Sequence, residues 1–137
     1  MHPDSGIIIR STNRTLTREI LPPEMIYPFD KRTIIDGEEL VYWRKSYGIC
    51  NAILNYCKKN NIPKNEGTND YILKKENIFD LVEIVLHFMD RDTWNKEGDS
   101  IWTYDEVLSY LRKILNNLLV IKKFMEHNPD IYLVFYY

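Results

Sequence analysis

The sequence predicts a single α+β domain, in which about three helices pack on a small, mostly antiparallel sheet. Helix-length segments repeat apolar residues at a helical spacing, and segments near both ends have the β-branched or aromatic composition of strands. The hydrophobic fraction of 45% and the ten tyrosines argue against a disordered chain. A chain of 137 residues can bury one core, so we expect one domain over residues 1–137.

The N-terminal part combines one short strand with segments that proline interrupts. Residues 6–10 (Gly-Ile-Ile-Ile-Arg) have the β-branched composition of a strand, and three prolines occur within residues 22–28. Proline lacks the backbone N–H that a sheet requires. We therefore expect residues 1–32 to form an irregular arm that carries this short strand.

A turn signal follows this arm. Asp36-Gly37 separates two apolar segments, 33–35 and 39–43. Asp-Gly favours a type I′ turn, which needs positive φ at both central positions and joins two adjacent strands. The sequence therefore predicts a hairpin between these two segments.

Three segments show the spacing of amphipathic helices, and they cover about residues 46–60, 76–90 and 103–126. Gly48 lies inside the first and costs about 1 kcal/mol relative to alanine there. We expect another segment to approach the helix closely at this glycine. In the second helix, Phe79 and Leu86 widen the apolar stripe, which predicts a deeply packed helix.

The remaining elements follow from local signals. Residues 92–101 are polar and are expected to form a loop. Thr103 and Glu106 form a capping box, which predicts the start of the third helix. The apolar tail 131–137 is expected to pair inside the sheet, because an exposed edge of this composition would aggregate. Residues 71–73 fit either an edge strand or a lead-in to the second helix.

The charge distribution bears on possible partners. The net charge is −2, and residues 76–106 hold nine acidic side chains against Arg91 and Lys96. This pattern lacks the broad basic face of a nucleic-acid binder, so no nucleic-acid partner is expected. An acidic face suits self-association or a basic partner, and an ordinary solvated surface is the alternative.

Cysteine usage and hydropathy indicate a cytoplasmic protein. Cys50 and Cys57 lie on one predicted helix, where seven residues rise about 10.5 Å. A disulfide requires Cα atoms within about 7 Å, so we expect two buried free thiols. No apolar run approaches the roughly 18 residues of a membrane span, and no secretory signal is recognisable.

Metal and cofactor sites are not expected. His2, His87 and His127 are far apart in the sequence, whereas metal ligands cluster. The acidic stretch after the second helix resembles a calcium loop, but Asn95 stands where glycine is needed and Ile101 where glutamate is needed. Motifs for nucleotide binding and for nucleophilic catalysis are absent, so the sequence does not support an enzyme.

The remaining candidate site lies where the strand 39–43 meets the first helix. In one interpretation Trp43 packs in the core, and Arg44 and Lys45 are simply solvated. In the other, Arg44 and Lys45 bind a carboxylate or phosphate at the first helical turn, with Tyr42 as a stacking surface. The candidate binding residues are therefore Tyr42, Arg44 and Lys45.

The order of the predicted elements resembles a family of small uncharacterised phage and prophage proteins. Residues 42–46 (Tyr-Trp-Arg-Lys-Ser) match the family's Tyr-Trp-Arg-Lys-Ala/Ser-Asn core, and the Tyr-rich segments 130–132 and 136–137 resemble its C-terminal strand. Tyr47 stands where the family usually has asparagine, and Cys50 lies near its usual histidine. The resemblance covers roughly residues 34–137.

The resemblance implies a viral or mobile-element setting but no known activity. It leads to the hypothesis of a non-enzymatic accessory protein that binds and inhibits a host protein in antiviral defence. One alternative is a binder or sponge for a phosphorylated small molecule or nucleotide that uses Tyr42, Arg44 and Lys45. A further alternative is an enzyme with a dispersed site.

Overall fold

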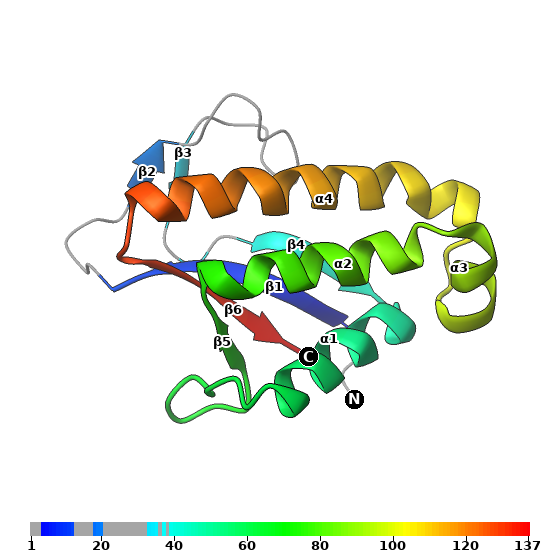
Figure 1. Cartoon of the computed structure of the whole chain (residues 1–137), viewed down its shortest axis with the longest axis horizontal. Helices are drawn as coiled ribbons and strands as arrows, with labels where there is room; N and C mark the ends of the chain where they lie inside the picture. Colours follow the sequence, from blue (N-terminus) through cyan, green and yellow to red (C-terminus); the bar gives the residue numbers. More distant parts are fainter. Residues whose placement is uncertain (1–3, 13–17, 21–32, 36, 38) are drawn as a thin grey trace.

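The computed structural model describes residues 4–12, 18–20, 33–35, 37 and 39–137. Its main sheet has four antiparallel strands in the order β4-β1-β6-β5, and a layer of helices lies on one side of it (Figure 1). The strands are β1 (Asp4–Ser11), β4 (Glu39–Arg44), β5 (Tyr71–Leu73) and β6 (Ile131–Tyr136), while β2 (Arg18–Ile20) and β3 (Thr33–Ile35) form a separate pair. The predicted α+β class is confirmed.

The strand predicted near the N-terminus is β1, and it lies inside the sheet. β1 pairs with β4 on one side and with β6 on the other, and its Ile7 and Ile9 are buried in the core. This position explains the β-branched composition, because a strand inside a sheet is flanked on both sides. Residues 13–17 and 21–32 of the expected arm lie outside the described residues.

The predicted hairpin between residues 33–35 and 39–43 is not formed. β3 pairs with β2, whereas β4 pairs with β1. Gly37 does adopt the positive φ of a turn, +97°, and its N–H donates to the carbonyl of Ile9 at 2.9 Å. The Asp-Gly signal encodes a local change of direction, but the choice of pairing partner follows from burial against β1. Asp36 lies outside the described residues.

The three predicted helices are present, and a fourth is added. They are α1 (Tyr47–Lys59), α2 (Ile78–Phe88), α3 (Arg91–Glu97) and α4 (Tyr104–His127), and a short 3-10 turn (Lys75–Asn77) precedes α2. α4, α2 and α1 lie side by side in that order (Figure 1). Among the described residues, no helix combines the length and apolar character needed to cross a membrane.

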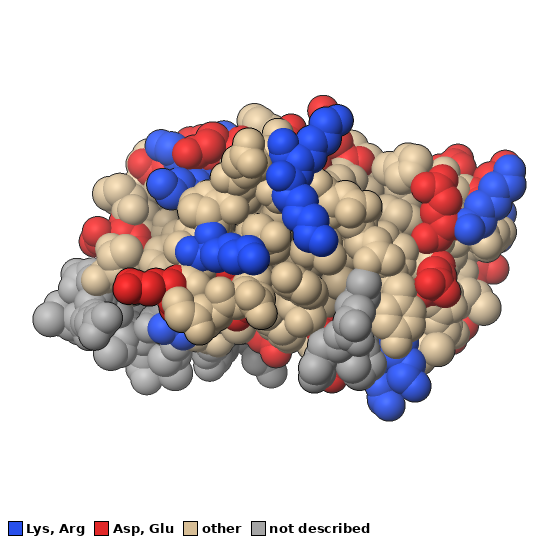
Figure 2. All heavy atoms as spheres, turned by 90° about the horizontal axis from the view of Figure 1, so that it is seen from below, with Lys and Arg blue, Asp and Glu red and all other residues tan. Residues whose placement is uncertain are grey.

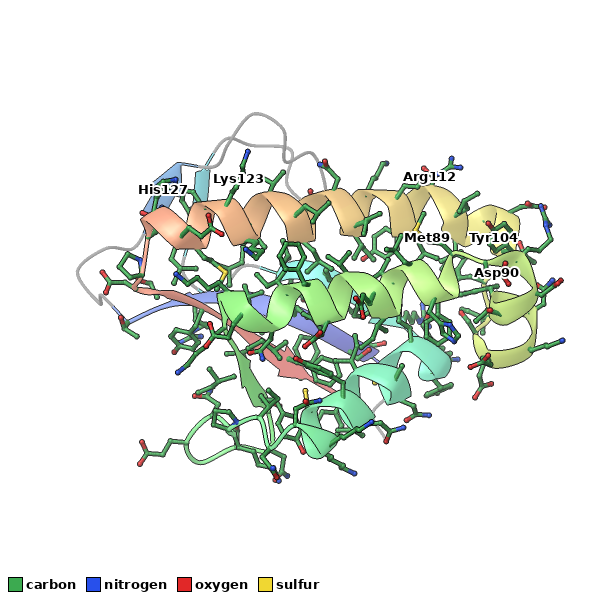
Figure 3. All side chains as sticks on the ribbon, viewed as in Figure 1. Met89, Asp90, Tyr104, Arg112, Lys123 and His127 are labelled. Atoms are coloured by element: carbon green, nitrogen blue, oxygen red, sulfur yellow. The ribbon has the colours of Figure 1, made fainter. Side chains whose placement is uncertain are left out.

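Helix α3 corrects the prediction of a polar loop over residues 92–101. The carboxylate of Asp90 caps this helix by accepting hydrogen bonds from the N–H and the hydroxyl of Thr93, at 3.0 and 3.1 Å. Trp94 anchors it, because its ring is buried against Phe88. The Tyr104 hydroxyl donates to the Met89 carbonyl at 2.6 Å, and Figure 3 shows both near Asp90 where α2 passes into α3. One buried tryptophan thus orders an otherwise polar segment.

The core lies between the sheet and the helical layer. The alternating residues Leu133 and Phe135 of β6 are fully buried, as the predicted pairing of the tail inside the sheet requires. By contrast, Phe79 and Leu86 on α2 are 56% and 48% exposed, so the expectation that they widen a deeply packed stripe is wrong. The Phe79 ring instead contacts the exposed side of α4, where the Lys122 ammonium lies 4.6 Å from its centroid.

The two cysteines are free and buried. Burial raises the pKa of the Cys57 thiol to about 12 and also raises the pKa of Cys50. Both thiols therefore stay protonated at neutral pH and act as small apolar groups in the core.

Acidic side chains lie near both ends of the face drawn in Figure 2. Figure 2 shows several of them at the end that carries α3, while basic side chains spread over the middle of that face. Near the start of α4, the Asp105 carboxylate pairs with the Arg91 guanidinium of α3 at 3.2 Å. The described residues contain no cluster of three or more His, Cys, Asp or Glu side chains placed to hold a metal ion.

Candidate functional site

A pocket of about 270 Å³ opens between β4 and the first two turns of α4. Four aromatic side chains line it, and they are Tyr42, Trp43, Trp102 and Tyr110. Arg44 and Glu106 contribute charged groups to the same wall. A concave surface that is rich in aromatic rings and carries a few polar groups is typical of a binding site. We call it the aromatic pocket.

Tyr110 ties α4 to the edge of the sheet and forms one side of the aromatic pocket. Its hydroxyl accepts a hydrogen bond from the Tyr42 N–H at 3.0 Å and donates one to the Tyr42 carbonyl at 2.5 Å. β4 is an edge strand, and edge strands present unpaired backbone groups. A single side chain therefore covers both outward backbone groups of Tyr42.

The corner between β4 and α1 forms the base of the pocket. Ser46 lies before α1, and its hydroxyl is 3.2 Å from that of Ser100. The first helical N–H groups, of Tyr47 and Gly48, donate to the carbonyls of Asp99 and Gly98, each at 3.0 Å. These two donors are thus already satisfied by the protein, and they are not available to an anion.

Gly48 is required for this contact. A Cβ atom at this position would lie 1.9 Å from the carbonyl oxygen of Glu97. The expectation that another segment approaches the helix closely here is confirmed. The segment that approaches is the end of α3, which the sequence did not reveal as a helix.

Trp102 is presented by a segment that is fixed on both sides. Its carbonyl accepts a hydrogen bond from the buried Trp94 indole at 3.0 Å, and its N–H donates to the Ser100 hydroxyl at 3.1 Å. The Trp102 side chain is nevertheless 43% exposed, and its neighbour Ile101 is 58% exposed. An ordered backbone therefore holds two large apolar side chains in solvent beside the pocket.

The two charged side chains of the pocket differ in whether another group of the protein already binds them. Glu106 is engaged, because its Oε1 accepts a hydrogen bond from the Thr103 N–H at 3.0 Å, and the hydrogen bonds with Thr103 lower its pKa. Arg44 is exposed and forms no ion pair within the described part of the chain. The cation of Arg44 is therefore the charge that a ligand or partner meets.

The Tyr42 hydroxyl has a hydrogen-bond partner among the described residues, whereas the Trp43 indole N–H has none. Desolvation and a hydrogen bond with the Asp4 carboxylate raise the pKa of Tyr42, so its hydroxyl stays neutral. Trp43 is 3% exposed, and its indole N–H has no acceptor among the described residues. Burial of an unpaired donor costs free energy, so this indole is held there by the packing of its ring.

The structure separates the three residues that the sequence singled out. Tyr42 and Arg44 line the aromatic pocket. Lys45 does not line it, and this residue takes a left-handed conformation with φ of 51° ahead of α1. Sequence reasoning missed Trp102 and Tyr110, although a tryptophan directly before a capping box was a usable signal for the first.

The described residues that line the pocket present mainly aromatic rings and one cation. The described residues that line it include no histidine, cysteine or lysine, and the carboxylate of Glu106 is held in a helix cap. General acid–base catalysis requires a titratable group that is free to reach the substrate. The arrangement is suited to recognition of an apolar group next to an anion.

Comparison with known proteins identifies no relatives. No family model, no curated protein and no solved structure matches the chain significantly. The likeness to the phage and prophage family therefore stays a prediction, and the function is argued below from the geometry of the aromatic pocket.

Proposed function

We propose that this protein is a binding module that docks on another protein through the aromatic pocket and its rim. The observation that carries the proposal is the placement of Trp102 and Tyr42, which are 43% and 39% exposed, next to the cation of Arg44, which forms no ion pair with the described residues. Tryptophan, tyrosine and arginine are the residues that most often dominate the energy of protein interfaces. Their convergence at one site supports a protein partner.

The size of the pocket supports the same conclusion. Its volume of about 270 Å³ lies just below the range of about 300–1,000 Å³ that accommodates whole small-molecule ligands. One apolar side chain of a partner fits this space. A nucleotide held by Tyr42, Arg44 and Lys45 is less well supported, because Lys45 lies outside the pocket and the helix N–H groups of Tyr47 and Gly48 have partners.

The partner docks by inserting a side chain rather than by adding a strand. Addition of a strand to β4 would need the outward N–H and carbonyl of Tyr42. Both groups are bound by the Tyr110 hydroxyl. A partner segment with an apolar residue for the pocket and a nearby carboxylate for Arg44 matches the groups that remain.

The biological role follows from the resemblance described above. A small viral protein that carries a binding surface and no reactive group at it would act by occupying a surface of its target. We infer that the target is a host protein and that binding inhibits it in antiviral defence. The acidic side chains at the end of the molecule that carries α3 are adjacent to the pocket and would favour a partner with basic groups at the rim.

Substitution of Trp102 tests the proposal. Trp102→Ala removes an exposed ring, so the fold should be retained while retention of the partner from a host lysate is lost. Leu119→Ala is a matched control, because Leu119 is also 43% exposed but does not line the aromatic pocket. The measurement compares the proteins that the wild type and the two variants retain. Retention of the same proteins by Trp102→Ala would contradict the proposal.

A further inference from the structure

A second depression lies at the opposite end of α4 from the aromatic pocket. It encloses about 500 Å³ where the ends of β5 and α4 meet the start of β6. Figure 1 shows these three points at one end of the molecule. Ile72, Met125 and Ile131 contribute apolar atoms to its lining, and Met125 and Ile131 are almost fully buried. This volume lies within the range of about 300–1,000 Å³ that is typical of small-molecule sites. We call it the lysine-rimmed pocket.

The strand register places Tyr132 beside Lys74 at this pocket. Arg10 pairs with Tyr132, and Leu73 pairs with Leu133, so Lys74 follows beside Tyr132 in extended conformation. Paired residues of antiparallel strands share a face of the sheet. Neighbouring strands lie about 4.8 Å apart. The half-buried Tyr132 ring therefore lies on the same face of the sheet as Lys74, which supplies a positive charge beside it.

The rim of the pocket carries more positive than negative charge. Lys74 and Lys75 are exposed, line the pocket and form no ion pair in the part of the chain that the structure describes. Glu76 is the opposing charge on the same rim. Lys75 also interacts electrostatically with the Glu126 carboxylate of α4, so the excess positive charge at the rim, which favours an anionic ligand, comes mainly from Lys74.

The backbone that carries the lysines is ordered. The Lys74 N–H donates to the Asn77 side-chain oxygen at 2.9 Å, and the Asn77 N–H donates to the Lys74 carbonyl at 2.9 Å. The Asn77 amide in turn donates to the Tyr56 hydroxyl at 3.2 Å. This turn is therefore formed before a ligand arrives, which lowers the entropic cost of binding.

We propose that the lysine-rimmed pocket binds a nucleoside monophosphate or a similar small ligand that joins a planar ring to a phosphate. The ring stacks on Tyr132 beside Ile72, which lies on the same face of the sheet, and the phosphate lies between the ammonium groups of Lys74 and Lys75. Stacking on an aromatic side chain tolerates different bases, so the class of ligand is defined by ring and phosphate together. This site is separate from the protein-docking surface at the aromatic pocket.

Calorimetric titration of the purified full-length protein tests the ligand class. The probes are adenosine monophosphate, adenosine and inorganic phosphate. Adenosine monophosphate should bind at one site, and adenosine and phosphate should each bind at least about tenfold more weakly, because each keeps only one of the two contacts. Equal affinity for phosphate and for adenosine monophosphate would overturn the role of Tyr132.

Charge variants test the position of the site. Lys74→Ala/Lys75→Ala should weaken binding of adenosine monophosphate by at least about tenfold. Lys58→Ala/Lys59→Ala removes the same charge from the exposed end of α1 and should leave the affinity unchanged. Glu76→Gln removes the opposing charge and should tighten binding about two- to fivefold.

Tyr132→Leu separates the contribution of ring stacking to ligand binding from the contribution of the lysine charges. This variant should weaken binding of adenosine monophosphate at least about fivefold and leave the affinity for phosphate unchanged. Thermal unfolding of each variant verifies that the fold is retained. Absence of binding by the wild type at millimolar adenosine monophosphate would overturn the proposal, as would equal losses in the two double-lysine variants.

Discussion

The two edges of the main sheet are protected in different ways. On β5, the Ile72 N–H donates to the carbonyl of Pro63 at 2.8 Å, and Lys64 forms a bridge with Tyr71. The backbone that covers the β5 edge therefore comes from a segment that lies only a few residues before β5 in the sequence. On β4, the outward groups of Tyr42 are covered by one hydroxyl, that of Tyr110, which lies 68 residues away.

This difference shows that one edge depends on backbone and the other on a single side chain. A backbone cover survives substitution of almost any side chain, because every residue carries the same N–H and carbonyl groups. A side-chain cover is lost when one oxygen atom is removed. The β4 edge also borders the aromatic pocket, so the less redundant edge is the one that we associate with docking of a protein partner.

Two glycines test how tightly each side of the molecule is packed. Gly48→Ala, beside the β4 edge, should destabilise the protein by about 3 kcal/mol or more, because the new methyl group overlaps backbone atoms of α3. Gly67→Ala, in the loop before β5, should cost only about 1–2 kcal/mol, which is the cost of a positive φ. Urea unfolding measures both values. Equal costs would mean that the two sides are equally able to relax.

Removal of the Tyr110 hydroxyl tests the β4 edge directly. Tyr110→Phe should lower the free energy of unfolding by about 1–3 kcal/mol, because two backbone groups of Tyr42 lose their partner. Lys64→Ala should change it by no more than about 0.5 kcal/mol, because the backbone cover of β5 stays. Hydrogen exchange is the sharper measurement. The Tyr42 amide should exchange faster in Tyr110→Phe, while the Ile72 amide keeps its rate.

A change in the exchange of the Ile72 amide in Tyr110→Phe would contradict the comparison. It would mean that the two edges open together and that neither cover acts locally. Aggregation of Tyr110→Phe at high protein concentration would support the role of Tyr110 as the cover of β4, since an uncovered edge strand can pair with another chain.

Alkaline pH should have the smallest effect, and it should act on the β4 side. Burial and a hydrogen bond to Glu39, at 2.9 Å, raise the pKa of Tyr136 well above the ordinary tyrosine value of about 10. The unfolded chain therefore loses this proton first, so the stability that Tyr136 contributes is complete below about pH 10. It is lost as the pH rises through the higher pKa of the folded state.

Thermal unfolding between about pH 9 and pH 11 measures this effect. The melting temperature of the wild type should fall more steeply with pH than that of Tyr136→Phe, which has no hydroxyl to ionise. Glu39→Gln should show an intermediate slope, because burial of Tyr136 remains. Parallel slopes for the wild type and Tyr136→Phe would exclude this linkage.

Part of the candidate site could be predicted from the sequence. The motif around Tyr42 and Arg44 combines aromatic and cationic groups at a strand-to-helix junction, and both residues line the aromatic pocket. Trp102 and Tyr110 were not predicted, because their relation to β4 depends on how α4 packs across the sheet edge. Lys45 looked equivalent to Arg44 in the sequence, but its left-handed backbone takes it out of the lining.

The sequence by itself determined the elements that depend on neighbouring residues. The capping box of Thr103 and Glu106 starts α4, the apolar spacing defines the buried faces of α1 and α4, and the apolar tail forms a strand inside the sheet. Only the tertiary structure decided that β4 pairs with β1, that Trp94 orders α3, and that Tyr110 reaches Tyr42. Local backbone preferences are encoded within a few residues, whereas pairing and burial depend on segments that meet only when the chain is folded.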